Sequence, residues 1–157
     1  MNKIAIFVDV QNIYYTTKET FQRQFNYRHL WNEINKLGDI VIANAYAIHR
    51  GDEKQLQFQN ALKKIGFTVK LKPFLQRADG SAKGDWDVGI AIDVMSCANN
   101  VDTVVLLSGD GDFDLLLEKI KKDDNTNTVV YGVPALTANT LIDSANNFIP
   151  INETYLL

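Results

Sequence analysis

Residues 104–113 read VVLLSGDGDF, and this stretch decides the fold. Its first four residues are apolar and begin with two β-branched valines, which predicts a short buried strand. A serine and two glycines then force a turn with little side-chain bulk. Asp110 and Asp112 lie in that turn, so two carboxylates follow the carboxyl end of a buried strand. In open α/β sheets this edge is where ligands bind.

The period of the pattern changes after the turn. Apolar residues then recur at helical spacing, which predicts a helix with Asp112 as its N-cap or a first-turn residue. These apolar residues are Phe113, Leu116, Leu117 and Ile120. Two carboxylates this close repel each other unless a cation lies between them or one stays protonated. Turn and capping roles alone would also explain them, so the choice depends on whether other strands deliver acids to the same edge.

The composition is that of one globular domain spanning residues 1–157, with 46% hydrophobic and 22% charged residues. No apolar run is long enough to span a membrane, and the run at residues 4–8 is too short for a signal peptide. We therefore expect a cytoplasmic protein with no membrane partner. Cys97 is the single cysteine and lies in an apolar helical segment, which favours a small buried thiol over a nucleophile or metal ligand.

The net charge of −3 argues against a generally basic nucleic-acid binder, but the charge is uneven. Between residues 49 and 84, eight Lys and Arg stand against three Asp and Glu, a local charge of +5. This basic segment predicts a track for a phosphate backbone beside an acidic pocket. Solvated helix faces explain Lys63 and Lys64 more simply. The better candidates flank or occupy an expected loop at residues 73–84, and they are Lys70, Lys72, Arg77 and Lys83.

Predicted strands and helices alternate along the whole chain, which indicates a mainly parallel, doubly wound sheet. Strands are expected at residues 3–8, 39–48, 67–74, 104–107, 127–131 and 147–150. Helices are expected at residues 12–20, 27–37, 52–66, 86–98, 112–120 and 137–145. The strand at 39–48 should be buried on both sides, and the strand at 67–74 should be an edge strand. Apolar stripes place Leu37 and Leu56 on the buried sides of their helices.

Acidic residues from separate segments should meet at one edge of this sheet. Parallel strands present their carboxyl ends together, so Asp9, after the first strand, should join Asp110 and Asp112. Asp87 should join them from the first turn of the helix at 86–98, with Asp85 as its cap. Such a cluster is typical of a divalent-metal site holding Mg²⁺ or Mn²⁺. A metal held by carboxylates suits phosphate-ester hydrolysis, because it neutralises phosphate charge and activates water.

Three further residues could assist this chemistry. Asn12, one turn beyond Asp9, could hold a metal-bound water or a phosphate oxygen. Ser108 could orient an aspartate, and Lys83 could contact a phosphate as a point charge. Asp93 is a different case, because six residues on a helix place it about 120° around the axis from Asp87. It therefore needs a buried partner or a path to solvent.

Exposed aromatic residues can stack on unpaired bases. Tyr14 and Tyr15 lie in the predicted helix at 12–20, but core packing explains most of the aromatic residues between Tyr14 and Tyr27 more simply.

Three motifs occur in an order that resembles the NYN domains, in their LabA-like branch, within the PIN-like nuclease superfamily. They are FVDVQN at 7–12, KGDWDV at 83–88 with Asp93 following, and SGDGDF at 108–113. The resemblance covers nearly the whole chain. It implies a PIN-like three-layer α/β/α fold with a mainly parallel central sheet, and metal-dependent ribonuclease chemistry. It also implies that the metal ligands and catalytic residues are Asp9, Asp87, Asp110 and Asp112. Asn12 and Asp93 match family positions as well.

Other classes of enzyme fit the residues less well. A dinucleotide-binding oxidoreductase would need glycines after the first strand, and residues 9–14 contain none. A phosphoaspartyl phosphatase would need an aspartate where Gln11 stands. A Toprim-like nuclease usually pairs its Asp-x-Asp motif with an upstream glutamate, whereas the first strand of this chain ends in aspartate. The remaining alternative is a non-catalytic RNA-binding or regulatory module that retains a metal-binding acidic pocket.

The expected partner is single-stranded RNA. DNA stays open, because no residue identifies a group that reads a 2′-hydroxyl. The choice between a monomer and a homodimer, and between endonuclease and exonuclease action, is also left open.

Overall fold

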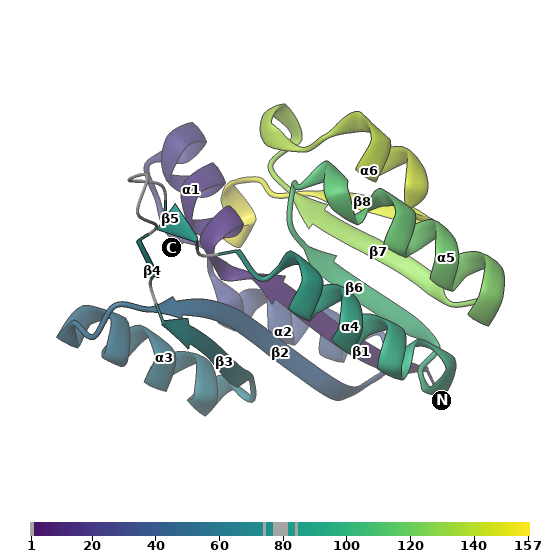
Figure 1. Cartoon of the computed structure of the whole chain (residues 1–157), viewed down its shortest axis with the longest axis horizontal. Helices are drawn as coiled ribbons and strands as arrows, with labels where there is room; N and C mark the ends of the chain where they lie inside the picture. Colours follow the sequence, from purple (N-terminus) through teal and green to yellow (C-terminus); the bar gives the residue numbers. More distant parts are fainter. Residues whose placement is uncertain (1, 74, 77–81, 84) are drawn as a thin grey trace.

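A computed structural model describes residues 2–73, 75, 76, 82, 83 and 85–157. Six strands form one sheet in the order β3-β2-β1-β6-β7-β8, and every neighbouring pair is parallel (Figure 1). The strands are β1 (Lys3–Asp9), β2 (Asp39–His49), β3 (Thr68–Pro73), β6 (Thr103–Leu107), β7 (Asn127–Gly132) and β8 (Asn147–Pro150). The expected parallel sheet, with β3 at an edge, is confirmed.

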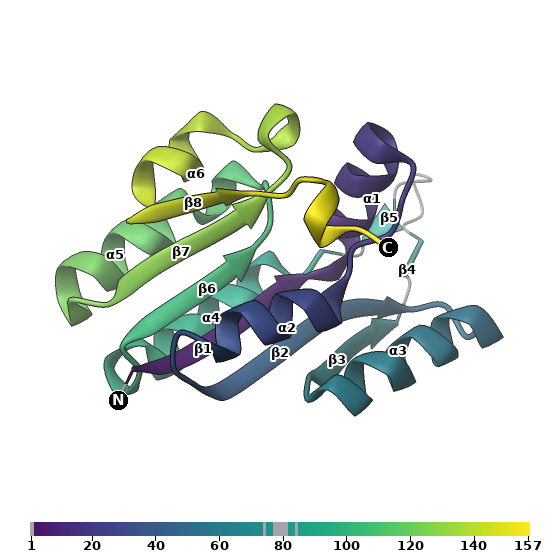
Figure 2. The same cartoon turned by 180° about the vertical axis from the view of Figure 1, so that it is seen from behind.

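Helices cover both faces of the sheet, as Figures 1 and 2 show from opposite sides. One face carries α1 (Val10–Phe21), α2 (Tyr27–Asn35) and α3 (Glu53–Ile65). The other carries α4 (Asp87–Cys97), α5 (Asp114–Asp124) and α6 (Asn139–Ser144). Short 3₁₀ turns complete the chain: η1 (Ala98–Asn100), η2 (Gly111–Phe113), η3 (Pro134–Leu136) and η4 (Glu153–Tyr155). The predicted three-layer α/β/α arrangement is therefore confirmed.

The core lies on both faces of the two central strands. Along β1, Ile4, Ile6 and Val8 join the apolar cluster under α1 to α3. Ala5 and Phe7 alternate with them and join the cluster under α4 to α6. Successive side chains on a strand point to opposite faces, so one buried strand supports two cores. Each fully buried aliphatic or Phe side chain stabilises the fold by about 1.5–3 kcal/mol.

The strand order reverses between β1 and β6. From β1 the chain proceeds outward to β2 and β3, then crosses to β6 on the other side of β1 and continues to β7 and β8. In doubly wound sheets, ligands bind at the carboxyl ends of the strands beside such a switch point. Asp9 ends β1 at this point, and the turn at residues 108–113 follows β6 there.

Some of the burial and loop predictions are wrong. The expected loop at residues 73–84 contains a short antiparallel pair, β4 (Leu75–Gln76) with β5 (Ala82–Lys83). The first half of β2 is not buried on both sides, since Val41 is 49% exposed. The cause is that β3 begins only opposite Asn44, and that a register shift makes Val41 an extra residue against β1.

The predictions that Leu37 and Leu56 are buried are both wrong. Leu37 is 64% exposed because α2 ends at Asn35, before the stripe reaches it. Leu56 is 54% exposed because it lies about 120° around α3 from the fully buried Leu62. Gln59 takes the inner position on that helix instead.

The prediction for the single cysteine is confirmed. Cys97 is a buried free thiol on α4, and its Sγ lies 3.5 Å from the carbonyl oxygen of Val94. No helix in the described part of the chain combines the length and apolar character needed to cross a membrane.

Candidate functional site

Three carboxylates meet at the switch point. Asp87, Asp110 and Asp112 each offer one carboxylate oxygen, and these atoms all lie within 4.8 Å of one another. We call these three residues the acidic cluster. Asp87 is the first residue of α4, whereas the other two flank Gly111 in the turn after β6. The structure thus brings together three of the four residues that the sequence suggested as metal ligands.

Close backbone packing fixes the turn after β6. Asp110 is the N-cap of η2, and its Oδ1 accepts a hydrogen bond of 2.9 Å from the backbone N–H of Asp112. Gly109 packs so tightly that a Cβ atom there would lie 2.5 Å from the carbonyl oxygen of Leu136. The carbonyl of Gly109 also accepts a hydrogen bond of 3.1 Å from the N–H of Ala138. The glycine is therefore needed for this close approach, which holds the acidic turn against the segment before α6.

The start of α4 is anchored to β2. The indole Nε1 of Trp86 donates a hydrogen bond of 2.9 Å to the carbonyl oxygen of Ala47. Trp86 itself occupies the N-cap position, so the prediction of Asp85 as the cap is wrong by one residue. The Oδ1 of Asp85 still accepts a hydrogen bond of 3.2 Å from the N–H of Asp87. These contacts orient the first turn of α4 towards the sheet edge.

Asp9 lies beside the acidic cluster and is connected to it through Ser108. The hydroxyl of Ser108, which is fully buried, donates a hydrogen bond of 3.1 Å to Oδ2 of Asp9 and accepts one of 3.1 Å from the N–H of Asp110. Asp9 is also the N-cap of α1 and accepts from the N–H of Asn12 at 3.5 Å. Ser108 thus has the contact needed to orient an aspartate. The role of Asp9 as a metal ligand stays a prediction.

Asn12 connects α1 to the acidic turn. Its Oδ1 accepts a hydrogen bond of 2.9 Å from the backbone N–H of Gly109. That oxygen is therefore engaged in holding the turn in place, and the suggested contact of Asn12 with water or phosphate stays a prediction.

The electrostatic environment disfavours several negative charges at this edge. Burial raises the pKa of Asp9 to about 6, although its two hydrogen-bond donors act in the opposite direction. Burial also raises the pKa of Asp87 to about 7, and a hydrogen bond with Asp110 contributes in the same direction. The charges that raise both values belong to neighbouring aspartates, Asp85 and Asp110 among them. The carboxyl groups of Asp9 and Asp87 therefore hold protons more tightly than isolated ones.

The acidic cluster fits a hard divalent cation. Its donor atoms are carboxylate oxygens, the ligands that Mg²⁺ and Mn²⁺ prefer. Three such oxygens within 4.8 Å of one another would be able to hold one ion. A cation bound there would also displace the proton that Asp87 holds because its pKa is raised.

The basic segment divides into residues with different contacts. Lys70 forms a 2.7 Å ion pair with Asp93, so its charge is already balanced. The Nζ of Lys72 lies 4.4 Å from the ring centroid of Trp86 and 3.4 Å from the carbonyl oxygen of Asp85, next to the start of α4. Lys83 lies in β5, but its side chain, like the whole of Arg77, falls outside the described residues.

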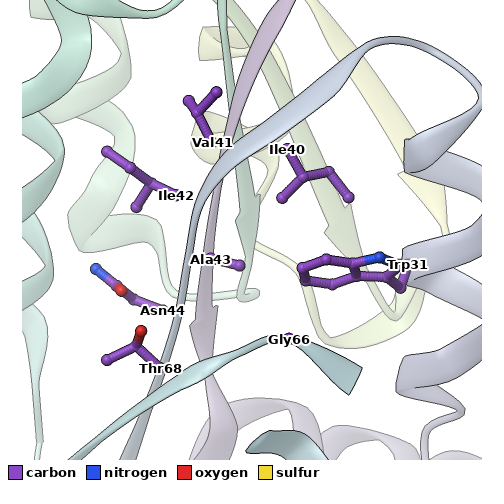
Figure 3. Close-up of a pocket in the computed structure, with 8 residues that line it drawn as sticks. All are labelled: Trp31, Ile40, Val41, Ile42, Ala43, Asn44, Gly66 and Thr68. Atoms are coloured by element: carbon purple, nitrogen blue, oxygen red, sulfur yellow. The ribbon is translucent and has the colours of Figure 1, made fainter. Parts of the chain in front are cut away.

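A separate pocket lies away from the acidic cluster. It has a volume of about 260 Å³ and lies at the first half of β2, beyond the start of β3. Figure 3 shows Trp31, from α2, facing Ile40, whereas Ile42 and Asn44 project to the other side of β2. Among the described residues no titratable side chain lines it; the lining residues are Trp31, Ile40, Val41, Ile42, Ala43, Asn44, Gly66 and Thr68. The described lining therefore offers no group for acid–base chemistry.

Sequence reasoning assigned Asp85 only a capping role, but its charge helps to raise the pKa values of both Asp9 and Asp87. The sequence signal for this effect is that Asp85 and Asp87 lie two residues apart at the start of a helix, which brings their side chains close together. Sequence reasoning also favoured core packing for most of the aromatic residues near Asn12. Tyr14 and Tyr15 are nevertheless 48% and 52% exposed.

Comparison with known proteins gives consistent matches. The family model described as NYN domain matches residues 3–152. The "Low amplitude and bright protein LabA" of Synechococcus elongatus is 28% identical over 160 residues, covering 97% of this chain and 85% of that protein.

Two solved structures are also similar. A crystal structure of a protein of unknown function from Vibrio parahaemolyticus is 52% identical, with a TM-score of 0.95 and coverage of 99% of this chain and 96% of that chain. Ribokinase from Giardia lamblia shares the fold alone, with 13% identity and a TM-score of 0.52 over 95% of this chain and 57% of that chain.

Proposed function

Because this chain belongs to the NYN domain family, in its LabA-like branch, we propose that it is a metal-dependent ribonuclease. NYN domains lie within the PIN-like nuclease superfamily, so a nuclease-like function is the starting point. The observation that carries the proposal is the acidic cluster, in which α4 and the turn after β6 present three carboxylates to one point. The charges that act on Asp87 there are those of other aspartates, which leaves room for an external cation.

Each carboxylate has a role in this proposal. Asp87, Asp110 and Asp112 would hold Mg²⁺ or Mn²⁺. The bound ion would neutralise phosphate charge and supply an activated water. Asp9, fixed by the Ser108 hydroxyl, would orient the attacking water and accept its proton. A carboxylate whose pKa is raised to about 6 is a suitable base near neutral pH.

Basic residues would bind the RNA backbone beside the cluster. Lys72 lies against Trp86, one residue from Asp87. From there it would contact a phosphate next to the scissile one. Arg77 and Lys83 extend the same basic segment in the sequence. We propose single-stranded RNA as substrate and the cytoplasm as the place of action.

The direct test is cleavage of end-labelled single-stranded RNA and of matching DNA, with Mn²⁺, Mg²⁺ or chelator. Wild type is compared with Asp110→Asn, which removes one charge from the acidic cluster and retains its size. Asp143→Asn is the matched control, because Asp143 is an exposed aspartate on α6 outside the cluster. We expect metal-dependent cleavage by wild type and the control, and loss of cleavage in Asp110→Asn.

The other outcomes are also informative. Equal cleavage by Asp110→Asn and wild type would contradict the assignment of the site. Metal-dependent binding of RNA without cleavage would instead support the non-catalytic RNA-binding module. Cleavage of DNA in preference to RNA would correct the substrate class.

A further inference from the structure

Two aromatic rings lie in solvent on α1. Tyr14 is 48% exposed and Tyr15 is 52% exposed. Where the structure describes exposure, the other large apolar side chains that are exposed are not aromatic. Among the aromatic residues nearby in the sequence, Phe25 and Tyr27 are buried and Phe21 is partly buried. The two exposed rings are therefore not needed to pack the core.

These rings are held in a defined arrangement. Their centroids lie 5.6 Å apart with an interplanar angle of 67°, an edge-to-face contact. Lys18, one turn later, donates a hydrogen bond of 3.2 Å to the hydroxyl of Tyr14, and its Nζ lies 5.4 Å from that ring. We call Tyr14, Tyr15 and Lys18 the α1 ledge. It offers a partner two π-faces and one positive charge on a rigid helix.

The helix that carries the ledge is built into the candidate site. Asp9 caps α1, and Asn12 ties the first turn of the helix to Gly109. α1 extends beyond the carboxyl ends of the strands in both views (Figures 1 and 2). The helix that carries the ledge therefore flanks the edge of the sheet where the carboxylates gather.

Helix geometry sets the distance between the ledge and the site. Tyr15 lies three residues after Asn12, which places it about 60° around the helix axis from the residue that contacts the acidic turn. The rise from Asp9 to Tyr15 is about 9 Å along the axis. Stacked nucleotides are spaced by about 3.4 Å, so this rise corresponds to roughly two or three nucleotides.

We infer that the α1 ledge stacks on unpaired bases of a single-stranded RNA, two or three nucleotides from a phosphate at the acidic cluster. This inference rests on the proposed function and adds the residues that bind the bases of the single strand. Every base has a π-face, so aromatic rings bind single strands with little sequence preference. The bases of a duplex are already stacked inside it and are not available to the rings. Lys18 adds an attraction for the adjoining phosphate.

Binding is measured so that it does not depend on cleavage. All variants are made on the Asp110→Asn background in Mg²⁺, and affinity for a fluorescent single-stranded RNA is measured by anisotropy. Tyr15→Ala removes a ring and Tyr15→Phe retains it. Thr20→Ala is the control, because Thr20 is an exposed, uncharged residue on the same helix.

We expect Tyr15→Ala to weaken binding of single-stranded RNA about 5- to 100-fold, as loss of one stacked base would. Tyr15→Phe and Thr20→Ala should stay within about twofold of the background protein, because stacking needs only the ring. Duplex RNA of the same length should bind more weakly and show no dependence on Tyr15.

An abasic substitution in the RNA locates the contact. The base is removed two or three nucleotides from the site that the wild-type protein cleaves. If no cleavage occurs, single bases are removed in turn along the RNA. One such removal should weaken binding to the background protein, which retains Tyr15. The same removal should have little further effect on Tyr15→Ala, because the two losses delete one interaction.

Failure of the ledge and failure of the proposed function are distinguishable. Tyr15-dependent binding without cleavage by wild type would support the ledge and contradict the nuclease. Cleavage by wild type, with affinity unchanged in both Tyr14→Ala and Tyr15→Ala, would overturn the ledge alone. If the Asp110→Asn background protein does not bind RNA at all, that result would also overturn the ledge.

Discussion

Asp87 and Asp93 lie six residues apart on α4, and their surroundings are opposite. Asp93 accepts hydrogen bonds of 2.7 Å from Lys70 and 2.8 Å from the hydroxyl of Tyr46. Burial alone would raise its pKa, but Lys70 and Tyr46 hold it below its usual value. Asp87 instead shares its surroundings with other aspartates, and its pKa is raised to about 7. The helix α4 thus carries one aspartate whose charge is balanced by a lysine and one that is surrounded by other aspartates.

This difference indicates what the acidic cluster is for. The ion pair at Asp93 shows that the fold can supply a lysine to an acid on this helix. At Asp87 it brings two further carboxylates instead, which destabilises the metal-free protein. Such an arrangement is typical of sites that take their positive charge from a bound ion or substrate. The four predictions that follow test this contrast.

The largest expected effect is on catalysis. Asp87→Asn should lower the rate of RNA cleavage by at least about 100-fold, because loss of a metal ligand removes several kcal/mol of transition-state stabilisation. Asp93→Asn should change the rate by less than about threefold, since Asp93 is bound to Lys70 and Tyr46 rather than to the cluster. Single-turnover rates at saturating Mn²⁺ measure both. Similar losses in the two variants would remove the distinction between the two acids.

The second prediction concerns metal binding without any RNA. A hundredfold excess of Mn²⁺ over its Kd should stabilise the wild-type protein by about 3 kcal/mol. For a domain of this size that is a rise in melting temperature of roughly 5–10 °C. The rise should be mostly lost in Asp87→Asn and retained in Asp93→Asn. Thermal denaturation with and without chelator tests this, and an equal rise in both variants would contradict the site.

The third prediction is a pH dependence of stability in chelator. The pKa of Asp9 is raised from 3.8 to about 6 in the folded protein, so folding favours its protonated form. Its contribution to stability is fully present below about pH 4 and is lost as the pH rises through about 6, on the order of 3 kcal/mol in total. Asp93 has the opposite sign, because its lowered pKa adds stability that is lost as the pH falls through its folded value.

Urea denaturation between pH 5 and pH 8 measures the free energy of unfolding for this test. Asp9→Asn should reduce the decline with rising pH and leave the part that is due to Asp87, whereas Asp143→Asn should leave the whole decline unchanged. A wild-type protein that becomes more stable from pH 5 to pH 7 in chelator would contradict the environment assigned to Asp9.

The contrast also shows what could be predicted from sequence. The parallel sheet and the meeting of Asp110 with Asp87 followed from strand–helix alternation, because parallel strands end at one edge. The partner of Asp93 could not be named, since Lys70 lies on β3 and only the fold brings it to α4. Leu56 shows a further limit. An apolar residue at the end of a helical stripe can lie on the solvent side, and the sequence pattern alone does not tell whether it packs against the core.

The smallest expected effect is the worth of the Lys70–Asp93 pair. Both side chains are partly exposed, at 38% and 29%, so solvent screens the interaction. We expect a coupling free energy of about 0.5–1 kcal/mol from a double-mutant cycle of Lys70→Met and Asp93→Asn in urea. Neither single variant should change the Mn²⁺-induced rise in melting temperature, because the pair balances a charge that the acidic cluster does not share. A loss of that rise in Lys70→Met would show instead that Lys70 contributes to the electrostatics of the cluster, and that the two acids on α4 belong to one site.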